Sequence, residues 1–397
     1  MKTLLLSELF PPRTGGSSRW FWEVYRRLPQ SRYQIVAGED PRQGEFDLTQ
    51  DLTITRMPLT LRSWGISNLR SIWDYGRASH RLGCLIRRDR VGMIHCGRCL
   101  PEGLMARLLK SWRGIPYLCF VHGEEMNYAA GSRELGYLAR WVLRGADFLI
   151  ANSRNTEGIL RDQWDVPPER IHILHPGVDT ERFVPAPRDP VVREQLGWGE
   201  RPVVLTVGRL QKRKGHDQMI RALHTVRRAI PNVLYAIVGD GEERGFLSDL
   251  TASEGLEEHV QFLGEVEDVR LVQCYQQCDL FALPNRQEGQ DIEGFGMVLV
   301  EAQACGKPVL AGASGGTAET MRIPETGLVV DCQGPDRLAA TVAELLLDGE
   351  RLAVTGRAGR EWVVDHFDWA VLARQASQLF GSENGLQRDH ITEAAAL

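Results

Sequence analysis

The chain has 397 residues, of which 43% are hydrophobic and 25% are charged, so it is long enough for two domains of ordinary globular composition. The formal net charge of −5, together with the lack of a recognisable nucleic-acid-binding module, argues against a nucleic acid partner. No run of about 18 apolar residues occurs, so no transmembrane helix is expected. The eight cysteines are scattered, mostly in apolar surroundings, which suits a reducing compartment, and the expected location is the cytoplasm.

Short apolar runs alternate with helix-like stretches, first in one half of the chain and then in the other. Strands are predicted at residues 3–6, 33–37, 93–96, 117–121, 148–151 and 171–174, and then at 203–207, 234–238, 260–263, 280–283, 309–311 and 328–330. Strands that are apolar throughout and separated by helices indicate parallel sheets covered on both faces. The predicted fold class is α/β, with two doubly wound, Rossmann-like domains that face a central cleft.

The domain boundary is predicted in the proline-rich segment 184–190, which is polar and shows no periodicity. The first domain then covers residues 1–185 and the second covers residues 186–366. A final helix is expected over 367–382, and the tail 383–397 is expected to be loosely held. Ligands of such folds bind at the carboxyl ends of the strands, which places the predicted site in the cleft between the domains.

Two features of the first domain follow directly on strands. Gly15 and Gly16 begin a turn that precedes a helix with a predicted serine cap, and free N–H groups at a helix start can bind an anion. His122 comes immediately after the strand at 117–121, so its imidazole is expected to face the cleft. A histidine at the end of a strand is also often structural, and that alternative stays open.

The loop after the first strand of the second domain carries Arg209 and Lys214. A guanidinium and an ammonium group at this place can hold a diphosphate between them. The whole chain has only five lysines, which makes a lysine in this loop informative. The alternative is a solvated basic turn between strand and helix.

Residues 288–316 place two carboxylates around a glycine-rich turn. Glu293 stands just before the turn Gly294-Phe295-Gly296, where a helix begins, and Glu301 follows eight positions later. The start of a helix offers free N–H groups and a positive dipole end, and glycines let a phosphate or a sugar approach the backbone. The alternative interpretation is that Glu301 is a solvated helix residue and Glu293 a partner of the helix dipole.

Taken together, these stretches resemble the retaining GT-B glycosyltransferases of family 4, also called group 1. The resemblance also implies that the final helix over 367–382 packs back on the first domain. The resemblance covers almost the full chain and is carried by Gly15-Gly16, His122-Gly123, residues 151–153 and 175–179, Gly208-Arg209, Lys214-Gly215, residues 238–241, and Glu293 with Glu301 in an E-x7-E pattern.

The resemblance implies a role for each predicted site residue. Arg209 and Lys214 would neutralise the diphosphate of a nucleotide-sugar donor, with the turn at Gly15-Gly16 and the helix that begins at Gly296 assisting. Glu301 would bind the ribose, and the loop around Val266 would contact the base. Glu293 and the backbone N–H groups of Phe295, Gly296 and Met297 would bind the transferred sugar. His122 would form a hydrogen bond near the 6-position of that sugar.

The implied activity is transfer of a hexose from a nucleoside-diphosphate sugar to a hydroxyl of a glycan or lipid-linked acceptor. UDP-glucose or a related UDP-hexose is favoured as donor, and the alternatives are a GDP-mannose-dependent mannosyltransferase and a non-catalytic nucleotide-sugar-binding scaffold. The chain has no Asp-x-Asp pair, so no metal or other cofactor is expected and the two cations would replace Mg²⁺.

The acceptor would bind to the first domain, which is rich in arginine between residues 51 and 113. Trp64 and Trp73 lie in this stretch, and Trp20 and Trp22 lie in the basic helix around residues 19–27. Arginines among aromatic residues suit an anionic membrane surface, which predicts peripheral attachment to the inner face of the membrane and a lipid-linked acceptor. The alternative is that the tryptophans belong to the core.

Overall fold

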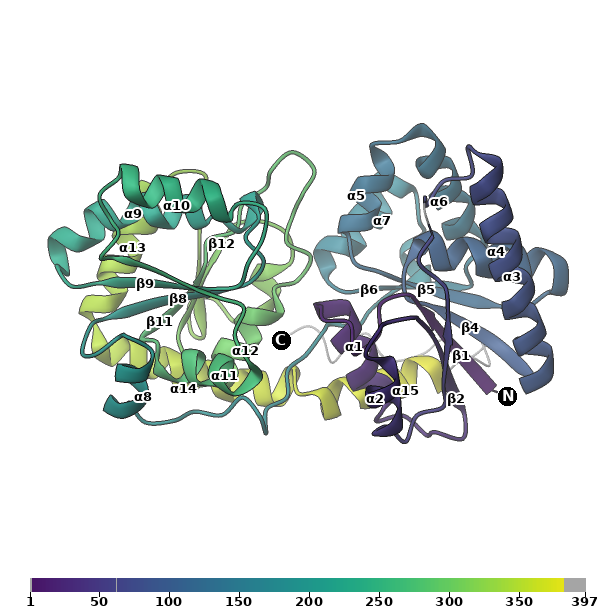
Figure 1. Ribbon diagram of the computed structural model, residues 1–397, viewed down its shortest axis with the longest axis horizontal. Coiled ribbons are helices and arrows are strands. Elements are labelled where there is room, and N and C mark those ends of the chain that lie inside the picture. The colour runs from purple at the N-terminus through teal and green to yellow at the C-terminus, as the bar shows by residue number, and fades with distance from the viewer. Residues whose placement is uncertain (1, 62, 382–397) are drawn as a thin grey trace.

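The computed structural model describes residues 2–61 and 63–381 and has two α/β domains side by side (Figure 1). The described residues of the first domain form a parallel sheet in the order β3-β2-β1-β4-β5-β6-β7. Its strands are β1 (Lys2–Ser7), β2 (Tyr33–Gly38), β3 (Ile54–Met57), β4 (Val91–Cys96), β5 (Tyr117–Val121), β6 (Phe148–Ala151) and β7 (Ile171–Ile173). Its helices are α1 (Gly16–Tyr25), α2 (Gln43–Leu48), α3 (Leu69–Asp89), α4 (Leu104–Arg113), α5 (Glu124–Ala130), α6 (Arg133–Gly145) and α7 (Arg154–Trp164).

The second domain repeats this architecture with a parallel sheet in the order β10-β9-β8-β11-β12-β13. Its strands are β8 (Val203–Val207), β9 (Leu234–Val238), β10 (Val260–Gly264), β11 (Leu280–Leu283), β12 (Val309–Gly312) and β13 (Gly327–Val330). Its helices are α8 (Pro190–Gln195), α9 (His216–Ala229), α10 (Arg244–Ser253), α11 (Asp268–Gln277), α12 (Met297–Ala304), α13 (Pro335–Leu347) and α14 (Gly349–His366).

The predicted fold class is confirmed, and every predicted strand is present. The one strand that the sequence analysis missed is β3, which lies at the edge of the first sheet. Its residues Ile54, Thr55 and Arg56 are only partly buried, so the segment lacks the continuous apolar character that identifies the central strands.

Each sheet is covered by helices on both faces, as the apolar strands require. In the first domain α3, α4, α6 and α7 pack on one face, while α1 packs on the other. In the second domain α9, α10 and α13 cover one face, and α8, α11, α12 and α14 cover the other. This arrangement directs the carboxyl ends of both sheets, and the loops that follow them, toward the space between the domains.

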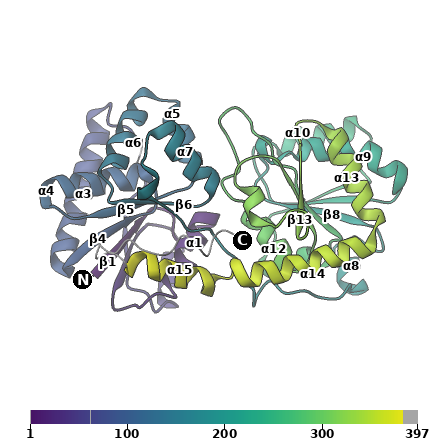
Figure 2. The ribbon, with the colours of Figure 1, turned by 180° about the vertical axis from the view of Figure 1, so that it is seen from behind.

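The chain crosses between the domains twice, and the two crossings lie side by side. The linker after β7 and the turn before α15 (Trp369–Gly381) are paired, because Val178 N–H donates to the Phe367 carbonyl at 2.9 Å and Trp369 N–H donates to the Val178 carbonyl at 3.2 Å. Figure 2 shows α14 and α15 running one after the other from the second domain to the first.

Helix α15 lies against α1 of the first domain, where the sequence analysis expects a returning helix. Phe380 is fully buried there, with its ring centroid 4.5 Å from that of His95 and 6.1 Å from that of Tyr25. The predicted boundary after residue 185 falls in the linker between β7 and α8. The predicted tail, 383–397, lies outside the described residues, as does residue 382.

Two expectations about α1 are wrong. No serine side chain caps this helix, because Gly15 is the N-cap residue, while Ser18 Oγ donates to the Arg13 carbonyl at 2.6 Å. The tryptophans of the helix also do not form the expected membrane contact, because Trp20 is 1% exposed and belongs to the core, while Trp22 is half-buried and its Nε1 donates to Gln50 Oε1 at 2.7 Å. Aromatic residues in a basic helix thus serve the packing of α1 under the sheet.

Candidate functional site

Two glycine-containing turns, one from each domain, meet at the centre of the cleft. Gly296 has a φ of 90° and is the N-cap residue of α12, a conformation that other residues rarely adopt. Across the cleft, a Cβ atom on Gly16 would lie 3.1 Å from the sulfur of Met297, so a side chain at Gly16 would crowd the start of α12. The N–H groups in the first turn of α12 have no carbonyl within the helix to bind, and they lie beside the first domain.

A charged cluster surrounds Glu293, which is 8% exposed. Its Oε2 accepts hydrogen bonds from Arg213 Nη1 at 2.5 Å and from Lys214 Nζ. Burial alone would raise the pKa of Glu293, but the charges of Lys214 and Arg213 lower it below its ordinary value. Glu293 is therefore an ionised carboxylate held between two cations.

Arg213 extends this cluster across the cleft. Its Nη2 donates to Glu124 of the first domain at 2.7 Å, and its Nε lies 3.1 Å from Asp291 Oδ1. Burial, which the charge of Arg213 only partly offsets, raises the pKa values of both Glu124 and Asp291. One guanidinium thus joins carboxylates of both domains to Glu293.

Arg209, the other half of the predicted diphosphate clamp, is exposed. In residues 2–61 and 63–381 its side chain has no hydrogen bond or ion pair. Lys214 Nζ would lie 3.8 Å from a Cβ atom on Gly208, so the ammonium group lies over the glycine that precedes Arg209. The structure thus gives the two cations different environments, one buried and paired and one exposed.

Glu301 is buried in α12, with 8% exposure, so the interpretation of it as a solvated helix residue is wrong. Its Oε2 accepts a hydrogen bond from the Tyr275 hydroxyl at 2.7 Å, and Arg19 of the first domain lies 3.9 Å from Oε1. Burial raises the pKa of Glu301, while Arg19 and Tyr275 oppose this shift. The carboxylate stands at the domain boundary with one oxygen held by Tyr275.

His122 lies at the start of the loop after β5, against the aromatic rings of α1. Its Nε2 lies 2.9 Å from the Gly97 carbonyl and its Nδ1 lies 3.3 Å from Ser17 Oγ. A carbonyl oxygen can only accept, so Nε2 carries a proton, and in the neutral imidazole Nδ1 then accepts from Ser17. To bond a sugar hydroxyl, as the sequence analysis predicts, Nδ1 would have to exchange Ser17 for that hydroxyl.

The structure restricts how Phe295 and Val266 can contact a ligand. The Phe295 ring is 3% exposed and lies between His175 and Phe367, with centroid distances of 5.3 and 5.6 Å, so only its backbone can serve a ligand. Val266 is half-buried in the loop between β10 and α11, where its side chain packs on the core. The predicted roles of both residues are accordingly roles for backbone groups.

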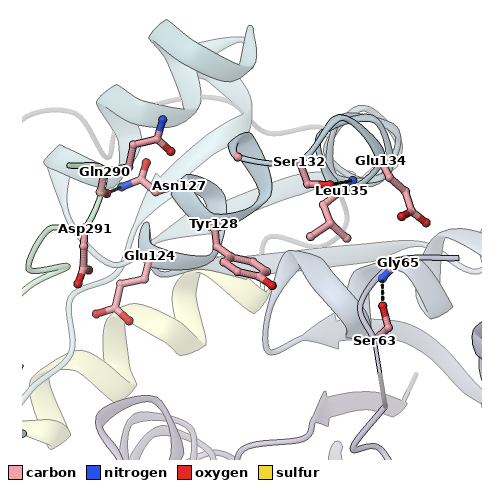
Figure 3. Close-up of a pocket in the computed structure, with 11 residues that line it drawn as sticks. Ser63, Gly65, Glu124, Asn127, Tyr128, Ser132, Glu134, Leu135, Gln290 and Asp291 are labelled. Atoms are coloured by element: carbon pink, nitrogen blue, oxygen red, sulfur yellow. Dashed lines mark hydrogen bonds between the residues drawn. The ribbon is translucent and has the colours of Figure 1, made fainter. Parts of the chain in front are cut away.

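A hollow of about 670 Å³ opens beside the charged cluster (Figure 3). Residues of both domains line it, and two of them, Glu124 and Asp291, also bind Arg213. The full lining is Ser63, Gly65, Glu124, Asn127, Tyr128, Gly131, Ser132, Glu134, Leu135, Gln290 and Asp291.

The two domains match family models of one class of enzyme. Residues 14–182 match the model described as glycosyltransferase family 4, and residues 189–362 match that of glycosyl transferases group 1. A GDP-mannose-dependent alpha-(1-6)-phosphatidylinositol monomannoside mannosyltransferase of Mycobacterium tuberculosis is 33% identical over 399 residues, which cover 96% of this chain and 99% of that protein. The chain is a family 4 glycosyltransferase.

Two further comparisons agree with this assignment. The glycosyltransferase is 32% identical over 391 residues to a GDP-mannose-dependent mannosyltransferase of Corynebacterium glutamicum that acts on a monoacylated phosphatidylinositol monomannoside, with 96% of this chain and 98% of that protein covered. Its fold is similar to that of Anabaena HepE in complex with UDP, with a TM-score of 0.82, 22% identity and coverage of 96% of this chain and 100% of HepE. The GT-B fold is thus shown.

A carboxylate of the second domain also binds the first domain of the glycosyltransferase. Glu319 accepts hydrogen bonds from the N–H groups of Arg154 at 2.7 Å and Asn155 at 3.0 Å, at the start of α7, and lies 3.1 Å from His175 Nε2. Burial would raise the pKa of Glu319, but these hydrogen bonds lower it. The start of α7 is therefore bound by a side chain from the other domain.

The sequence analysis missed four charged residues of this cleft: Arg213, Glu124, Asp291 and Glu319. The signal for Arg213 is its place in the run Lys212-Arg213-Lys214, opposite the acidic segment 288–293. Of the helices in residues 2–61 and 63–381, none combines the length and hydropathy needed to cross a bilayer.

Replacing Arg213 tests whether the cluster stabilises the fold. We expect Arg213→Met to lower the free energy of unfolding by about 3 kcal/mol, because removal of one partner leaves a buried carboxylate underpaired. The matched control is Arg209→Met, which removes an exposed arginine and should change the free energy by less than about 0.5 kcal/mol. Urea unfolding of both variants measures the difference, and equal losses would contradict the role of the cluster.

Proposed function

We propose that this glycosyltransferase transfers mannose from GDP-mannose, with retention of the anomeric configuration, to a hydroxyl of a lipid-linked glycan or polyol. The observation that carries the donor assignment is full-length similarity to mannosyltransferases described as GDP-mannose-dependent, at 33% and 32% identity. The UDP-hexose favoured from sequence is the less well supported alternative, since the similarity to HepE with bound UDP concerns the fold alone.

The proposed chemistry depends on charge that develops on the departing diphosphate. Arg209 and Lys214 would neutralise it, with the positive end of α12 adding to their effect. A phosphate near Lys214 competes with Glu293 for the ammonium group. Glu293 is then free to accept from a hydroxyl of the transferred sugar, while Arg213 keeps it ionised and in place.

Glu301 would bind the ribose of the donor. Its Oε2 is already engaged by Tyr275, which fixes the orientation of the carboxylate and leaves Oε1 for ribose hydroxyl groups. Arg19, 3.9 Å from Oε1, would approach the nucleotide from the first domain. The base would meet backbone groups of the loop that contains Val266.

We also propose that the first domain rests on an anionic membrane surface through α3. Its N-terminal end exposes Leu69, Ile72 and Trp73 by 84%, 50% and 62%. The same helix exposes Arg70, Arg77, Arg81, Arg87 and Arg88. Exposed apolar residues next to a row of cations suit the interface of an anionic bilayer.

A thermal-shift comparison tests the donor. GDP and GDP-mannose should stabilise the protein, by about 2.7 kcal/mol at a hundredfold excess over Kd, whereas UDP and UDP-glucose should have little effect. Glu301→Gln should weaken the shift, because an amide is a poorer acceptor for two ribose hydroxyls, and Glu350→Gln, an exposed residue of α14, should leave it unchanged. Stabilisation by the uridine series alone would restore the UDP-hexose assignment.

Turnover measurements test the cation that faces the diphosphate. Lys214→Ala should lower kcat by about 10²- to 10³-fold, since the charge acts on the transition state. Lys212→Ala, which removes an exposed lysine 3.0 Å from Glu288, should have little effect. The wild-type protein should keep its activity in EDTA, and a loss that Mg²⁺ restores would contradict the proposal that protein cations act in place of a metal.

Vesicle sedimentation tests the membrane surface. The protein should bind phosphatidylcholine vesicles that contain phosphatidylglycerol at low salt, and each arginine of α3 changed to glutamine should weaken binding about fivefold. The double variant Leu69→Ser, Trp73→Ser should bind poorly. Leu347→Ser with Val354→Ser removes comparably exposed apolar groups from the second domain and should bind normally. Absence of binding by the wild-type protein would refute this proposal.

A further inference from the structure

The hollow lies beside the charged cluster in which Glu293 is proposed to bind the transferred sugar. It is bounded by α5 and the start of α6 in the first domain and by Gln290 and Asp291 in the second (Figure 3). Asn127 Nδ2 donates to the Gln290 carbonyl at 2.5 Å and ties the two walls together. Through Glu124 and Asp291, the hollow adjoins Arg213 and thereby Glu293.

The charged side chains among the described lining residues of the hollow are carboxylates. They belong to Glu124, Glu134 and Asp291, of which Glu124 and Asp291 are bound by Arg213, and no lysine or arginine lines the hollow within residues 2–61 and 63–381. Carboxylates accept hydrogen bonds from hydroxyl groups, and this lining offers no cation of its own to a phosphate. The chemistry of this lining thus suits a ring with many hydroxyl groups and no anionic substituent.

An aromatic side chain stands in the middle of the hollow. Tyr128 is 66% exposed, and its ring packs edge-on against Trp64, with centroids 5.4 Å apart and an interplanar angle of 82°. The guanidinium of Arg98 also lies over the Trp64 ring, 5.3 Å from its centroid. Tyr128 thus packs on a supported side chain and stays largely exposed, as a platform for the C–H face of a sugar ring requires.

The hollow also adjoins the proposed membrane surface. Gly65 lines it, the next residue, Ile66, donates its N–H to Glu134, and α3 begins shortly afterwards with the exposed Leu69. A lipid-linked acceptor could thus place its ring in the hollow while its lipid stays at the apolar end of α3.

We propose that this hollow is the acceptor subsite and that it takes the uncharged, hydroxyl-rich ring of the acceptor, with any acceptor phosphate outside it. This inference rests on the proposed transferase function. It separates two roles that the sequence analysis combined. The basic residues of α3 serve the membrane surface, and the ring that receives the sugar is recognised by carboxylates and by Tyr128.

Saturation-transfer NMR tests this subsite with methyl α-D-mannopyranoside and myo-inositol, each measured with GDP present. At least one of these uncharged rings should give signals in the wild-type protein, and mannose 6-phosphate should give much weaker ones. Tyr128→Ala should weaken binding about tenfold, because the platform is lost. The matched control is Tyr137→Ala, which removes a tyrosine of α6 that is 71% exposed and not part of the lining, and it should bind as the wild type does.

Equal signals in the two tyrosine variants, no signal from either uncharged ring, or equally strong binding of mannose 6-phosphate would overturn the proposal. The GDP signals provide a separate readout. Their absence in the wild-type protein would refute the donor assignment, whereas normal GDP signals without a Tyr128-dependent ring signal would refute the acceptor subsite alone.

Discussion

The cleft depends on the pairing of the ionised Glu293 carboxylate with Lys214 and Arg213. A carboxylate with 8% exposure is costly to bury unless it is paired, and here Lys214 and Arg213 both bind one of its oxygens. Because Arg213 also binds Glu124 in the first domain, the charge balance around Glu293 and the contact between the domains are one network. A change in the separation of the domains therefore changes the electrostatics around Glu293.

Glu319 provides a second polar connection between the domains. It binds the start of α7, and Gly16 and Met297 form a further close approach between the domains. The paired crossings at Val178 and Phe367 keep the domains in register behind the cleft. The contacts that Glu293 and Glu319 make in the cleft are ionic or polar, so ligand groups can replace them. The two chain crossings are instead joined by backbone hydrogen bonds. This contrast suits a cleft that must admit a donor and release a nucleotide.

The sequence predicted what depends on local pattern. Strands such as β5 and β8 are apolar throughout and flanked by helices, so they were found, while β3 was missed because an edge strand with one polar face lacks that signature. Lys214, Glu293 and Glu301 were found because they stand beside glycine turns after strands. The bond between Arg213 and Glu124 joins residues 89 positions apart, and the contact between Glu319 and Arg154 joins residues 165 apart. Partners at such separations become visible only once the topology has placed them.

The fold divides the aromatic and basic residues of the first domain between core and surface, because Trp20 is 1% exposed whereas Trp73 is 62% exposed. An arginine-rich segment with aromatic residues suggests one continuous surface, but in the fold its residues contact different partners. Arg56 pairs with Asp47, and Arg98 lies between Glu8 and Trp64. A row of exposed arginines lies along α3, whereas the charged side chains among the described lining residues of the hollow are carboxylates. A single acceptor can satisfy both surfaces if its anionic and lipid parts stay at the membrane and its hydroxyl-bearing ring enters the cleft. In the proposed arrangement, an acceptor phosphate kept outside the hollow would not compete with the donor diphosphate for Lys214 and Arg209.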